Sequence, residues 1–367
     1  MVGSGIVGAA CAYTAAGLGA QVTLVDAAEP GQATGAGAGI ICPWTSDVDD
    51  EVRYGYACLA ARDYPGLIAE LAEAGEPDVS YRRVGALWLP LPEGTESALT
   101  TTTVVSLLTE RRASAPEIGD VEILADAADL FPPLRPGTPA VHLTGAARVD
   151  GRRLAAALTR AAVRRGAQLR TGHATLKHQT GRVHAVTINS EPLPADAVVA
   201  ATGAWTSQFL APAGITVRVE PQRGQIAHIG MEPADTSRWP VVLPSATGHY
   251  LLAFDDSRVV AGATRETGAG FDARLTPGGV AEVLANALNV APGLSDGTLR
   301  EIRVGLRPAG PDPRPLLGTI AGLDGLVVAT GLGHSGLTLG PLTGQIAAQL
   351  ALGQDPAFDV TPFDPIR

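Results

Sequence analysis

Short continuous apolar segments alternate along this chain with longer segments in which apolar residues recur at helical spacing. Residues 197–201 and 326–329 contain almost only Ala, Val and Leu, which is typical of strands buried on both faces of a parallel sheet. Between such segments lie Ala- and Leu-rich stretches long enough for helices of three or more turns. This alternation predicts an α/β protein with a parallel sheet.

The expected elements are distributed over the whole chain. Helices are expected over 9–18, 51–74, 104–113, 126–131, 150–165, 277–288 and 341–352. Strands are expected over 21–26, 82–89, 167–176, 183–188, 195–201, 225–229, 250–254, 258–263, 301–308 and 326–330. The blocks 46–142 and 216–300 lack the strand–Gly turn–helix units of the rest, so they are interpreted as a second, largely antiparallel domain.

A G-x-G-x-x-G turn stands at the start of the chain. It consists of Gly3, Gly5 and Gly8 and precedes a helix, a strand over 21–26 and an acid, Asp26. In a dinucleotide site the first Gly allows the tight turn, the second lets the backbone approach the pyrophosphate, and the third lets the helix pack closely. The helix N-terminus favours the phosphates, and Asp26 can accept the ribose hydroxyls. The alternative is a Gly-rich turn in an unrelated α/β protein.

The first strand of this unit is short. Only Met1 and Val2 precede the turn, whereas a strand usually has about five residues. We therefore expect a weakened first strand.

Two further Gly-rich segments follow the same logic. Residues 33–41 are rich in Gly and Ala and lead directly into Ile40 and Ile41, so their backbone can lie against a planar ligand, although a flexible linker is the alternative. Residues 331–336 connect the strand 326–330 to a helix, whose N-terminus offers a second partial positive charge.

Composition excludes several classes of function. The net charge of −10 leaves no basic surface for nucleic acid, so no nucleic-acid partner is expected. The three cysteines, at 11, 42 and 58, form neither a CxxC pair nor a metal-ligand cluster, which favours reduced thiols, a cytoplasmic location and no metal. No apolar run reaches the roughly 18 residues of a spanning helix, and no signal peptide is expected. A homo-oligomer is possible on this composition.

The motifs taken together resemble the FAD-dependent D-amino acid oxidase superfamily, in particular its glycine oxidase, sarcosine oxidase and D-amino acid dehydrogenase group. The resemblance covers nearly the whole chain. The matching segments are GSGIVG (3–8) with Asp26, TGAGAGII (34–41), VVAATGAW (198–205), PQRGQ (221–225), VVAGATRETGAGFD (259–272), VGLRPAGPDPRPLLG (304–318) and ATGLGHSGLTLGPLTG (329–344).

The resemblance implies a Rossmann-like FAD-binding domain and a discontinuous α+β substrate domain built on an antiparallel sheet. The FAD-binding domain is expected to comprise 1–45, 143–215 and 300–367, and the substrate domain 46–142 and 216–299. The residues implied for cofactor binding are Gly3, Gly5, Ile6, Val7, Gly8, Asp26, Ala27, Ala33, Thr34, Ala38, Gly39, Ile40, Ala174, Thr202, Gly203, Trp205, Arg307, Gly331, Leu332, Gly333, His334, Ser335, Gly336, Leu337 and Thr338.

The catalytic residues implied by the resemblance are Arg307, Tyr250 and His334. Arg307 matches the arginine that pairs with the substrate carboxylate, a task that suits its bidentate guanidinium, and Tyr250 matches a tyrosine that assists it. The alternatives are a structural ion pair for Arg307, a core position for Tyr250 and a capping or exposed position for His334. Arg265 and His249 are weaker candidates.

Two departures from the family pattern concern the cofactor and the electron acceptor. Covalent flavin in the family uses a Cys after the Gly-Leu-Arg-Pro region or a His in the second Gly loop, and this chain has neither, which predicts non-covalent FAD. Sarcosine-type oxidases use a Lys near the flavin for oxygen, but the only lysine here, Lys177, falls on a strand near the adenine end. Either another cation serves oxygen, or the electron acceptor is not oxygen.

The predicted reaction is oxidation of the C–N bond of a small amino acid or secondary amine. A hydride passes to flavin N5, and the imine product hydrolyses to a keto acid and an amine. One alternative is a flavin-dependent 2-hydroxy-acid oxidoreductase, because the same arginine would bind that substrate. Another is a non-catalytic FAD-binding accessory subunit.

Overall fold

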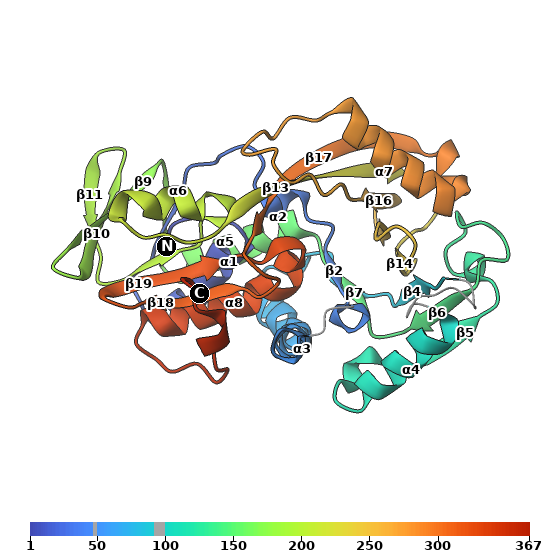
Figure 1. Ribbon diagram of the computed structural model, residues 1–367, viewed down its shortest axis with the longest axis horizontal. Coiled ribbons are helices and arrows are strands. Elements are labelled where there is room, and N and C mark those ends of the chain that lie inside the picture. The colour runs from blue at the N-terminus through green and yellow to red at the C-terminus, as the bar shows by residue number, and fades with distance from the viewer. Residues whose placement is uncertain (47–49, 92–99) are drawn as a thin grey trace.

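The computed structural model describes residues 1–46, 50–91 and 100–367, whose helices and strands form two groups (Figure 1). The first group contains both chain ends and is built around a parallel sheet. The second is built around a longer, mostly antiparallel sheet. The predicted α/β fold is confirmed by this arrangement of mixed sheets and helices.

The parallel sheet pairs four strands and one isolated bridging residue. The strands are β1 (Thr23–Asp26), β8 (Gln168–Thr171), β12 (Val198–Ala200) and β19 (Leu323–Thr330). β1 pairs with β8, β12 pairs with β19, and Val2 bridges the two pairs through Val25 and Ala200. The first strand is thus reduced to Val2, whose N–H donates to Val199 O at 2.9 Å. The predicted weakness of this strand is confirmed.

Three helices pack together in this group: α1 (Ile6–Gly17), α5 (Gly151–Arg164) and α8 (Gly336–Ala351). The contact of α1 with α8 is closer than side chains allow, since a Cβ at Gly344 would lie 2.4 Å from Val7 O. Small residues on both helices therefore bring the start of α8 beside the start of α1.

The larger sheet has eight strands. In order they are β17 (Thr298–Ala309), β13 (Glu220–Gly230), β16 (Arg258–Gly262), β15 (Tyr250–Phe254), β14 (Val241–Pro244), β4 (Ala86–Leu89), β6 (Ala140–Leu143) and β5 (Val121–Leu124). All neighbours are antiparallel except β14 and β4. Helix α7 (Pro277–Val290) packs on β13 and β16.

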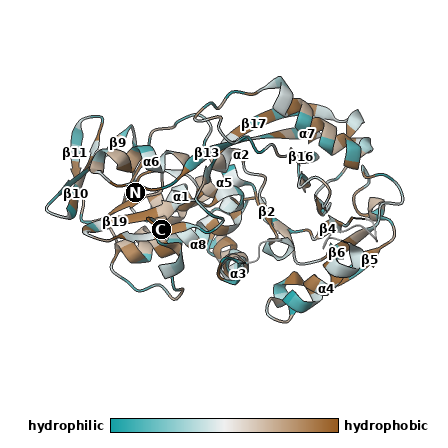
Figure 2. Cartoon of the chain, viewed as in Figure 1, coloured by the Kyte–Doolittle hydropathy of each residue, from teal (hydrophilic) through white to brown (hydrophobic). Residues whose placement is uncertain are grey.

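The remaining elements are shorter or peripheral. They are β2 (Ile40–Ile41), β3 (Arg82–Arg83), β7 (Ala147–Arg148), β9 (Ala174–Gln179), β10 (Arg182–Ile188), β11 (Glu191–Pro194), β18 (Leu316–Ile320), α2 (Ala33–Ala36), α3 (Glu51–Glu73), α4 (Thr101–Arg112), α6 (Thr206–Leu210) and the 3-10 turns η1 (Pro43–Thr45), η2 (Pro116–Ile118), η3 (Ala127–Asp129), η4 (Gly203–Trp205), η5 (Ala211–Ala213), η6 (Pro292–Asp296), η7 (Gly333–Ser335) and η8 (Thr361–Phe363). Figure 2 shows hydrophilic residues along β10 and β11. The residues of β11 are mostly exposed.

Two predicted strands are each divided by a glycine. The strand expected over 82–89 breaks at Gly85, whose φ is +74°, so that β3 and β4 join different sheets. The strand expected over 167–176 breaks at Gly172, so that β8 pairs with β1 whereas β9 pairs with β10. In each case the glycine lets the chain change direction where the apolar pattern continues.

Two predicted helices have different bounds. The helix expected over 126–131 is only the 3-10 turn η3, because Pro132 and Pro133 follow and cannot continue it. The helix expected to begin at Pro341 begins at Gly336 instead, with Pro341 inside it. Pro341 leaves the carbonyl of Leu337 without its helical N–H partner, and the Tyr64 hydroxyl of α3 donates to that carbonyl.

A buried polar chain connects the two groups. Asp150 caps α5 by accepting hydrogen bonds from the N–H groups of Arg152 and Arg153, and its Oδ2 accepts from Arg258 NH2 at 3.2 Å. Arg258 NH1 donates to His228 Nδ1 at 2.9 Å, so the neutral ring bears its proton on Nε2. Burial, followed by the nearby Arg303 and Arg258, lowers the pKa of His228 to about 3.

We expect His228 to make folding stability depend on pH. Because its folded pKa of about 3 lies below the ordinary 6.5, only the unfolded chain binds a proton between these values. Stability is therefore highest above pH 6.5 and falls by about 1.4 kcal/mol per pH unit below it. Thermal unfolding from pH 7 to 5 measures this, and His228→Gln flattens the pH dependence whereas exposed His178→Gln does not. Equal slopes for the two variants would contradict it.

Candidate active site

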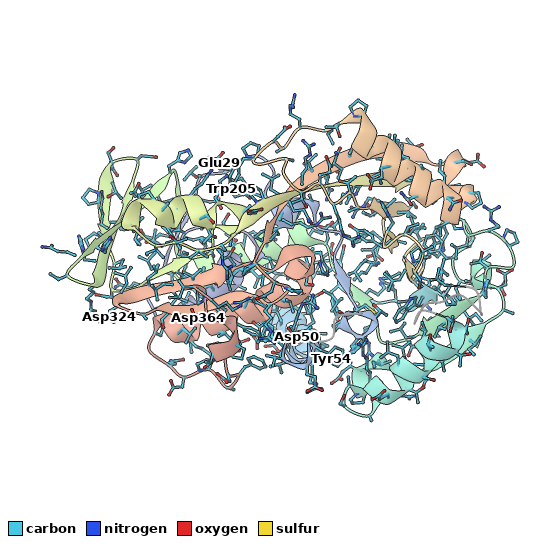
Figure 3. All side chains as sticks on the ribbon, viewed as in Figure 1. Glu29, Asp50, Tyr54, Trp205, Asp324 and Asp364 are labelled. Carbon is cyan, nitrogen blue, oxygen red and sulfur yellow. The ribbon has the colours of Figure 1, made fainter. Side chains whose placement is uncertain are left out.

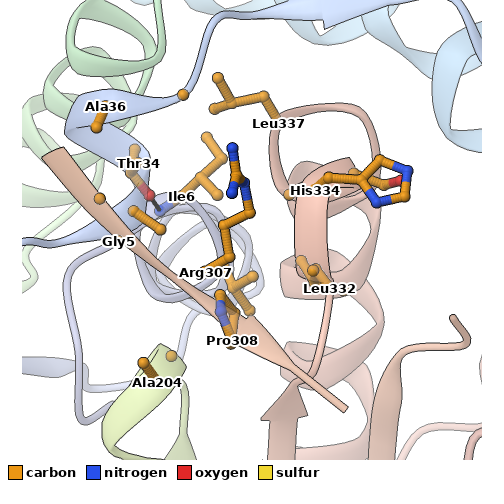
Figure 4. A pocket seen from close by; sticks show the side chains of 18 of the residues that line it. Gly5, Ile6, Thr34, Ala36, Ala204, Arg307, Pro308, Leu332, His334 and Leu337 are labelled. Carbon is orange, nitrogen blue, oxygen red and sulfur yellow. Dashed lines mark hydrogen bonds between the residues drawn. The ribbon is translucent and has the colours of Figure 1, made fainter. Parts of the chain in front are cut away.

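A cavity of about 980 Å³ lies where the two groups meet. Its walls come from the three Gly-rich segments of the parallel-sheet group and from β15 and β17 of the larger sheet. Figure 4 shows Arg307 of β17 entering the space between the Gly5–Ile6 turn and the Leu332–Leu337 loop.

The first Gly-rich turn has no room for a side chain at Gly3 or Gly8. A Cβ at Gly3, whose φ is +97°, would lie 2.3 Å from Ala201 O, and a Cβ at Gly8 would lie 1.8 Å from Gly3 O. Helix α1 begins immediately after Gly5 without a side-chain cap, so its N-terminus faces the cavity. Backbone N–H groups and the partial positive charge at this helix end suit a phosphate.

Asp26 lies at the end of β1 and lines the cavity, but it already has protein partners. Its Oδ2 accepts hydrogen bonds from Ser4 N at 2.6 Å and Ser4 Oγ at 2.7 Å. Its Oδ1 accepts from Ala28 N at 2.6 Å and Gln32 Nε2 at 2.7 Å. A ribose hydroxyl can therefore reach this carboxylate if the Ser4 hydroxyl or the Gln32 amide rotates away. The sequence did not reveal that Ser4 and Gln32 hold the Asp26 carboxylate in place.

Hydrogen bonds join the second Gly-rich segment to the first and to the start of α8. Thr34 Oγ1 accepts from Ile6 N at 3.0 Å, and Thr338 Oγ1 donates to Ile40 O at 3.0 Å. A Cβ at Gly39 would lie 1.8 Å from Val149 O, which makes glycine necessary there. Helix α8 also begins without a side-chain cap, next to the cavity. Two helix N-termini thus face one cavity.

Residues at the other end of the cavity come from separate elements. Ala174 begins β9, next to Gly172 and His173, and all three line the cavity with Asp26. Thr202 to Trp205 form its wall after β12, where Gly203 O accepts from Thr330 Oγ1 at 3.0 Å. Figure 3 labels Trp205 and Glu29 near each other, and Tyr54 of α3 elsewhere in the view; all three line the cavity.

Arg307 lies at the end of the cavity toward the larger sheet. Its NH1 donates to Thr264 O at 2.9 Å, and the described residues contain no carboxylate that forms an ion pair with it. A Cβ at Gly224 would lie 2.5 Å from Arg307 NH2, so the guanidinium lies directly against the backbone of β13. Burial lowers the pKa of Arg307, and Arg265 nearby also lowers it, whereas Tyr250 and Glu266 raise it. Such a cation suits an anionic ligand.

Tyr250 lies beside Arg307 in the cavity wall. A Cβ at Gly262 would lie 2.5 Å from the Tyr250 hydroxyl, so glycine makes room for this ring. Burial raises the pKa of Tyr250, so the hydroxyl keeps its proton at neutral pH and can donate a hydrogen bond.

Arg265 and His249 also line this end. Arg265 is exposed and donates to Gly248 O at 3.2 Å, and no described carboxylate forms an ion pair with it. His249 Nδ1 lies 3.2 Å from Thr247 O, and its Nε2 lies 3.5 Å from Glu282 Oε1. The two weaker candidates are thus in the cavity with Arg307.

The structure brings together nearly all of the residues expected in the site. Every residue predicted for cofactor binding or catalysis lines the cavity except Gly8 and Gly331. Gly8 packs under the first turn, and Gly331, with φ +72°, turns the chain after β19. The ring of His334 points away from the Arg307 guanidinium in Figure 4. The individual roles of these residues stay predictions.

Helix α3 contributes cavity residues that the sequence did not indicate. Arg53 and Tyr54 line the wall, and Arg53 donates to Ser335 Oγ at 2.9 Å and to Pro313 O at 2.9 Å. Trp88 of β4 also lines it, with its Nε1 donating to Ser245 Oγ at 2.7 Å. No motif surrounds Arg53 and Tyr54, so only their position in the tertiary structure identifies them, whereas the sequence had already offered Trp88 as either a pocket or a core residue.

Neither a metal centre nor a membrane-spanning helix is found in the part of the chain that the structure describes. Its His, Cys, Asp and Glu side chains form no group of three that could hold a metal ion. Its helices are all too short or too polar to cross a bilayer.

Comparison with known proteins identifies similar chains over the full length. The family model described as FAD dependent oxidoreductase (DAO) matches residues 1–350. The uncharacterized oxidoreductase YurR of Bacillus subtilis is 45% identical over 372 residues, covering 100% of this chain and 97% of that protein. The glycine oxidase of Pseudomonas aeruginosa is 31% identical over 379 residues, with the same coverage of each. The crystal structure of iminodiacetate oxidase (IdaA) from Chelativorans sp. BNC1 has a TM-score of 0.95 and 45% identity, covering 99% of this chain and 98% of that one.

The residues present fit the cofactor of this family. The turn at Gly3, where no Cβ fits, and the N-termini of α1 and α8, which lack a cap from their own N-cap side chains, suit a pyrophosphate and an electron-rich ring. Asp26, which the resemblance implies for the ribose, also lines this cavity. FAD is therefore the cofactor that the family and this cavity both indicate.

We expect Asp26→Asn to weaken FAD binding roughly tenfold to a hundredfold. The change removes a charged acceptor and turns an amide N–H₂ toward the N–H groups of Ser4 and Ala28. Fluorescence titration of the apoprotein with FAD measures the effect. Asp324→Asn, an exposed change on β19, is the matched control. If both variants bind FAD as the wild type does, Asp26 has no role in holding the cofactor.

Proposed function

Since the chain belongs to the DAO family of FAD-dependent oxidoreductases, we propose that it oxidises the C–N bond of a small amino acid or secondary amine. The observation that supports this most directly is Arg307, a guanidinium without a described carboxylate partner, beside Tyr250 in a cavity that fits FAD. Relatives with glycine oxidase and iminodiacetate oxidase activity support the same class of substrate.

The proposed division of labour follows the two groups of elements. Residues 1–45, 143–215 and 300–367 would hold FAD, and 46–142 and 216–299 would shape the substrate end, with 47–49 and 92–99 outside the described residues. The FAD would be bound without a covalent bond, because no Cys follows the Gly-Leu-Arg-Pro segment and no His lies in 33–41.

Arg307 and Tyr250 would bind and orient the substrate. The planar guanidinium can donate two parallel hydrogen bonds to a carboxylate, which fixes both its position and its plane. The protonated Tyr250 hydroxyl can donate a third. These contacts would hold the C–H bond next to nitrogen in one orientation, which lowers the entropic part of the barrier.

When bound, FAD would supply the chemistry, as the two-electron oxidant that accepts a hydride from the carbon next to nitrogen. The nitrogen of the substrate must be unprotonated for its lone pair to form the C=N bond as the hydride leaves. Water then adds to that imine and releases a carbonyl compound and an amine. The electrons finally pass to oxygen or to another small acceptor.

The second arginine favours a substrate with two anionic groups. Arg265 lies at the exposed side of the cavity and is close enough to Arg307 to lower its pKa. Two guanidinium groups without described acid partners leave positive charge that a second carboxylate would balance. The 45% identical iminodiacetate oxidase acts, as its name states, on a secondary amine with two carboxylates. We therefore propose an N-carboxymethyl amino acid or iminodicarboxylate as substrate class.

Acid precipitation of the purified protein tests the mode of flavin binding. With non-covalent FAD we expect essentially all yellow colour in the supernatant and none in the pellet. Flavin that stays with the denatured protein contradicts this part of the proposal.

Anaerobic reduction tests the function itself. Glycine, sarcosine, iminodiacetate, D- and L-alanine and lactate are added in turn, and bleaching near 450 nm is followed. We expect iminodiacetate to reduce the flavin and lactate not to.

Arg307→Ala should lower kcat/KM at least about thirtyfold, or about 2 kcal/mol, through loss of a buried charge pair. Exposed Arg182→Ala is the control. No bleaching of flavin-loaded wild type by any amine would refute the proposal.

The variant Arg265→Gln tests whether Arg265 binds the second carboxylate of the substrate. We expect kcat/KM for iminodiacetate to fall about tenfold or more, because one charge-assisted hydrogen bond is lost. The value for sarcosine, which has one carboxylate, should change less than about threefold. Equal losses for the two substrates would mean that Arg265 does not read the second carboxylate. Testing the Arg265→Gln variant with all of these substrates therefore identifies the substrate class without relying on Arg307.

A further inference from the structure

The carboxylate of Glu266 lies near Arg307, but its two oxygens accept hydrogen bonds from other residues. Its Oε2 accepts hydrogen bonds from Arg223 Nε at 3.0 Å and Arg223 NH2 at 2.6 Å. Its Oε1 accepts from Gln225 Nε2 at 2.7 Å and Thr264 Oγ1 at 2.7 Å. Both oxygens of Glu266 therefore have two donors each. Its negative charge acts on Arg307 through space, because the described hydrogen bonds of Arg307 go to other residues.

Thr264 connects this carboxylate to Arg307. It is fully buried, its N–H donates to Gln225 O at 3.3 Å, and its Oγ1 accepts from Gln225 N at 3.0 Å. With the hydroxyl also donating to Glu266, the residue is fixed on both sides. Its carbonyl is then the acceptor for Arg307 NH1 at 2.9 Å. The direction of the guanidinium thus depends on a peptide group that Glu266 and Gln225 hold.

Arg223 fixes the other side of Glu266. It is 8% exposed, and its NH1 also donates to Asp272 Oδ2 at 2.9 Å and Asp272 O at 3.2 Å. Backbone hydrogen bonds join Arg223 and Glu266 in both directions, at 3.0 and 2.9 Å. Burial alone would raise the pKa of Glu266, but Arg223, Gln225 and Thr264 lower it, so the carboxylate is charged at neutral pH.

We propose that Glu266, held by Arg223, is a positioning residue that sets the Arg307 guanidinium for the substrate carboxylate through the Thr264 carbonyl. The inference rests on the proposed function of Arg307. Glu266 does not touch the ligand. It keeps the Thr264 carbonyl in place for one donor of Arg307, while its own oxygens are satisfied and do not compete for the other donors. A Glu266 that paired with Arg307 directly would occupy the ligand's place.

The competing interpretation is that the cluster only stabilises the 264–276 segment. The two interpretations differ in what Glu266→Gln does. A structural role lowers thermal stability and leaves the affinity for carboxylates unchanged in the protein that remains folded. A positioning role lowers carboxylate affinity in folded, flavin-loaded protein.

The experiment titrates acetate into the holoenzyme and follows the perturbation of the flavin absorption spectrum. Acetate has the carboxylate but no amine, so its affinity is independent of turnover. We expect its Kd to rise about tenfold in Glu266→Gln, which corresponds to about 1.4 kcal/mol. The KM of the amine substrate should rise similarly and kcat should change less. Exposed Glu220→Gln, on β13 near Arg223, is the matched control.

Thr264 supplies a second, smaller change. Thr264→Val removes the hydroxyl that donates to Glu266 and accepts from Gln225 N, and we expect the same rise in Kd for acetate. Thr264→Ser keeps the hydroxyl and should restore affinity. If Glu266→Gln does not fold, this pair decides the question.

The results separate this inference from the proposed function. Wild type that binds acetate, together with Glu266→Gln and Thr264→Val within twofold of it, overturns the positioning role and leaves the function intact. The positioning role is also overturned if the Kd for acetate rises only in those variants whose FAD content or unfolding midpoint falls as well. Flavin-loaded wild type that neither binds acetate nor is reduced by amines overturns both proposals.

Discussion

The antiparallel pairing of β13 with β17 is the constraint on which the candidate site depends. The two strands pair from Glu220 opposite Ala309 to Gly230 opposite Thr298, and Gly305 to Pro308 of β17 line the cavity. Leu306 N donates to Gly31 O at 2.8 Å, just before the second Gly-rich segment, and Ala309 bridges Leu332 in the third, so one strand contacts the chain at both places. Because this register places Gly224 opposite Gly305, both glycines leave room on the same face of the sheet, where the Arg307 guanidinium lies against Gly224 and α2 lies against Gly305.

Charge is distributed unevenly along the cavity. Asp26 and Glu29 lie at one end, whereas Arg307 and Arg265 lie at the other. Described ion pairs occupy most of the remaining arginines, for example Arg258 with Asp150 and Arg223 with Glu266. An arginine held between two carboxylates is neutralised by the protein, but one without such a partner keeps its attraction for an anionic ligand. The chain is acidic overall, yet this part of the cavity is cationic, which is compatible because a small anion needs only one or two placed cations.

Local patterns predicted most elements, and the failures have identifiable causes. The helix expected over 51–74 is found at Glu51–Glu73, because burial and periodicity agree there. The apolar segments 195–201 and 326–330 do contain buried strands, but β12 is only Val198–Ala200 and β19 begins earlier, at Leu323. The strands expected over 82–89 and 167–176 were each two strands, since a glycine turn does not interrupt an apolar pattern. The start of α8 was missed because Pro341 looks like a first helical residue, whereas a hydroxyl from α3 supplies the partner for the carbonyl that proline leaves free.

The sequence by itself identified the first Gly-rich turn, the acid at the end of β1 and the two further Gly-rich segments, because each depends on residue type at short spacing. It also offered Arg307 as a candidate, through the resemblance. Glycine where no Cβ fits and arginine where a carboxylate must bind are requirements that can be recognised without a fold. Only the tertiary structure decided that Arg53, Tyr54 and Arg265 share the cavity, and that Glu266 reaches Arg307 through Thr264. Those relations join residues from strands and helices far apart in the chain, and side-chain distances across a sheet depend on register and packing. The sequence names the groups that do chemistry, and the fold decides which of them are left without a partner.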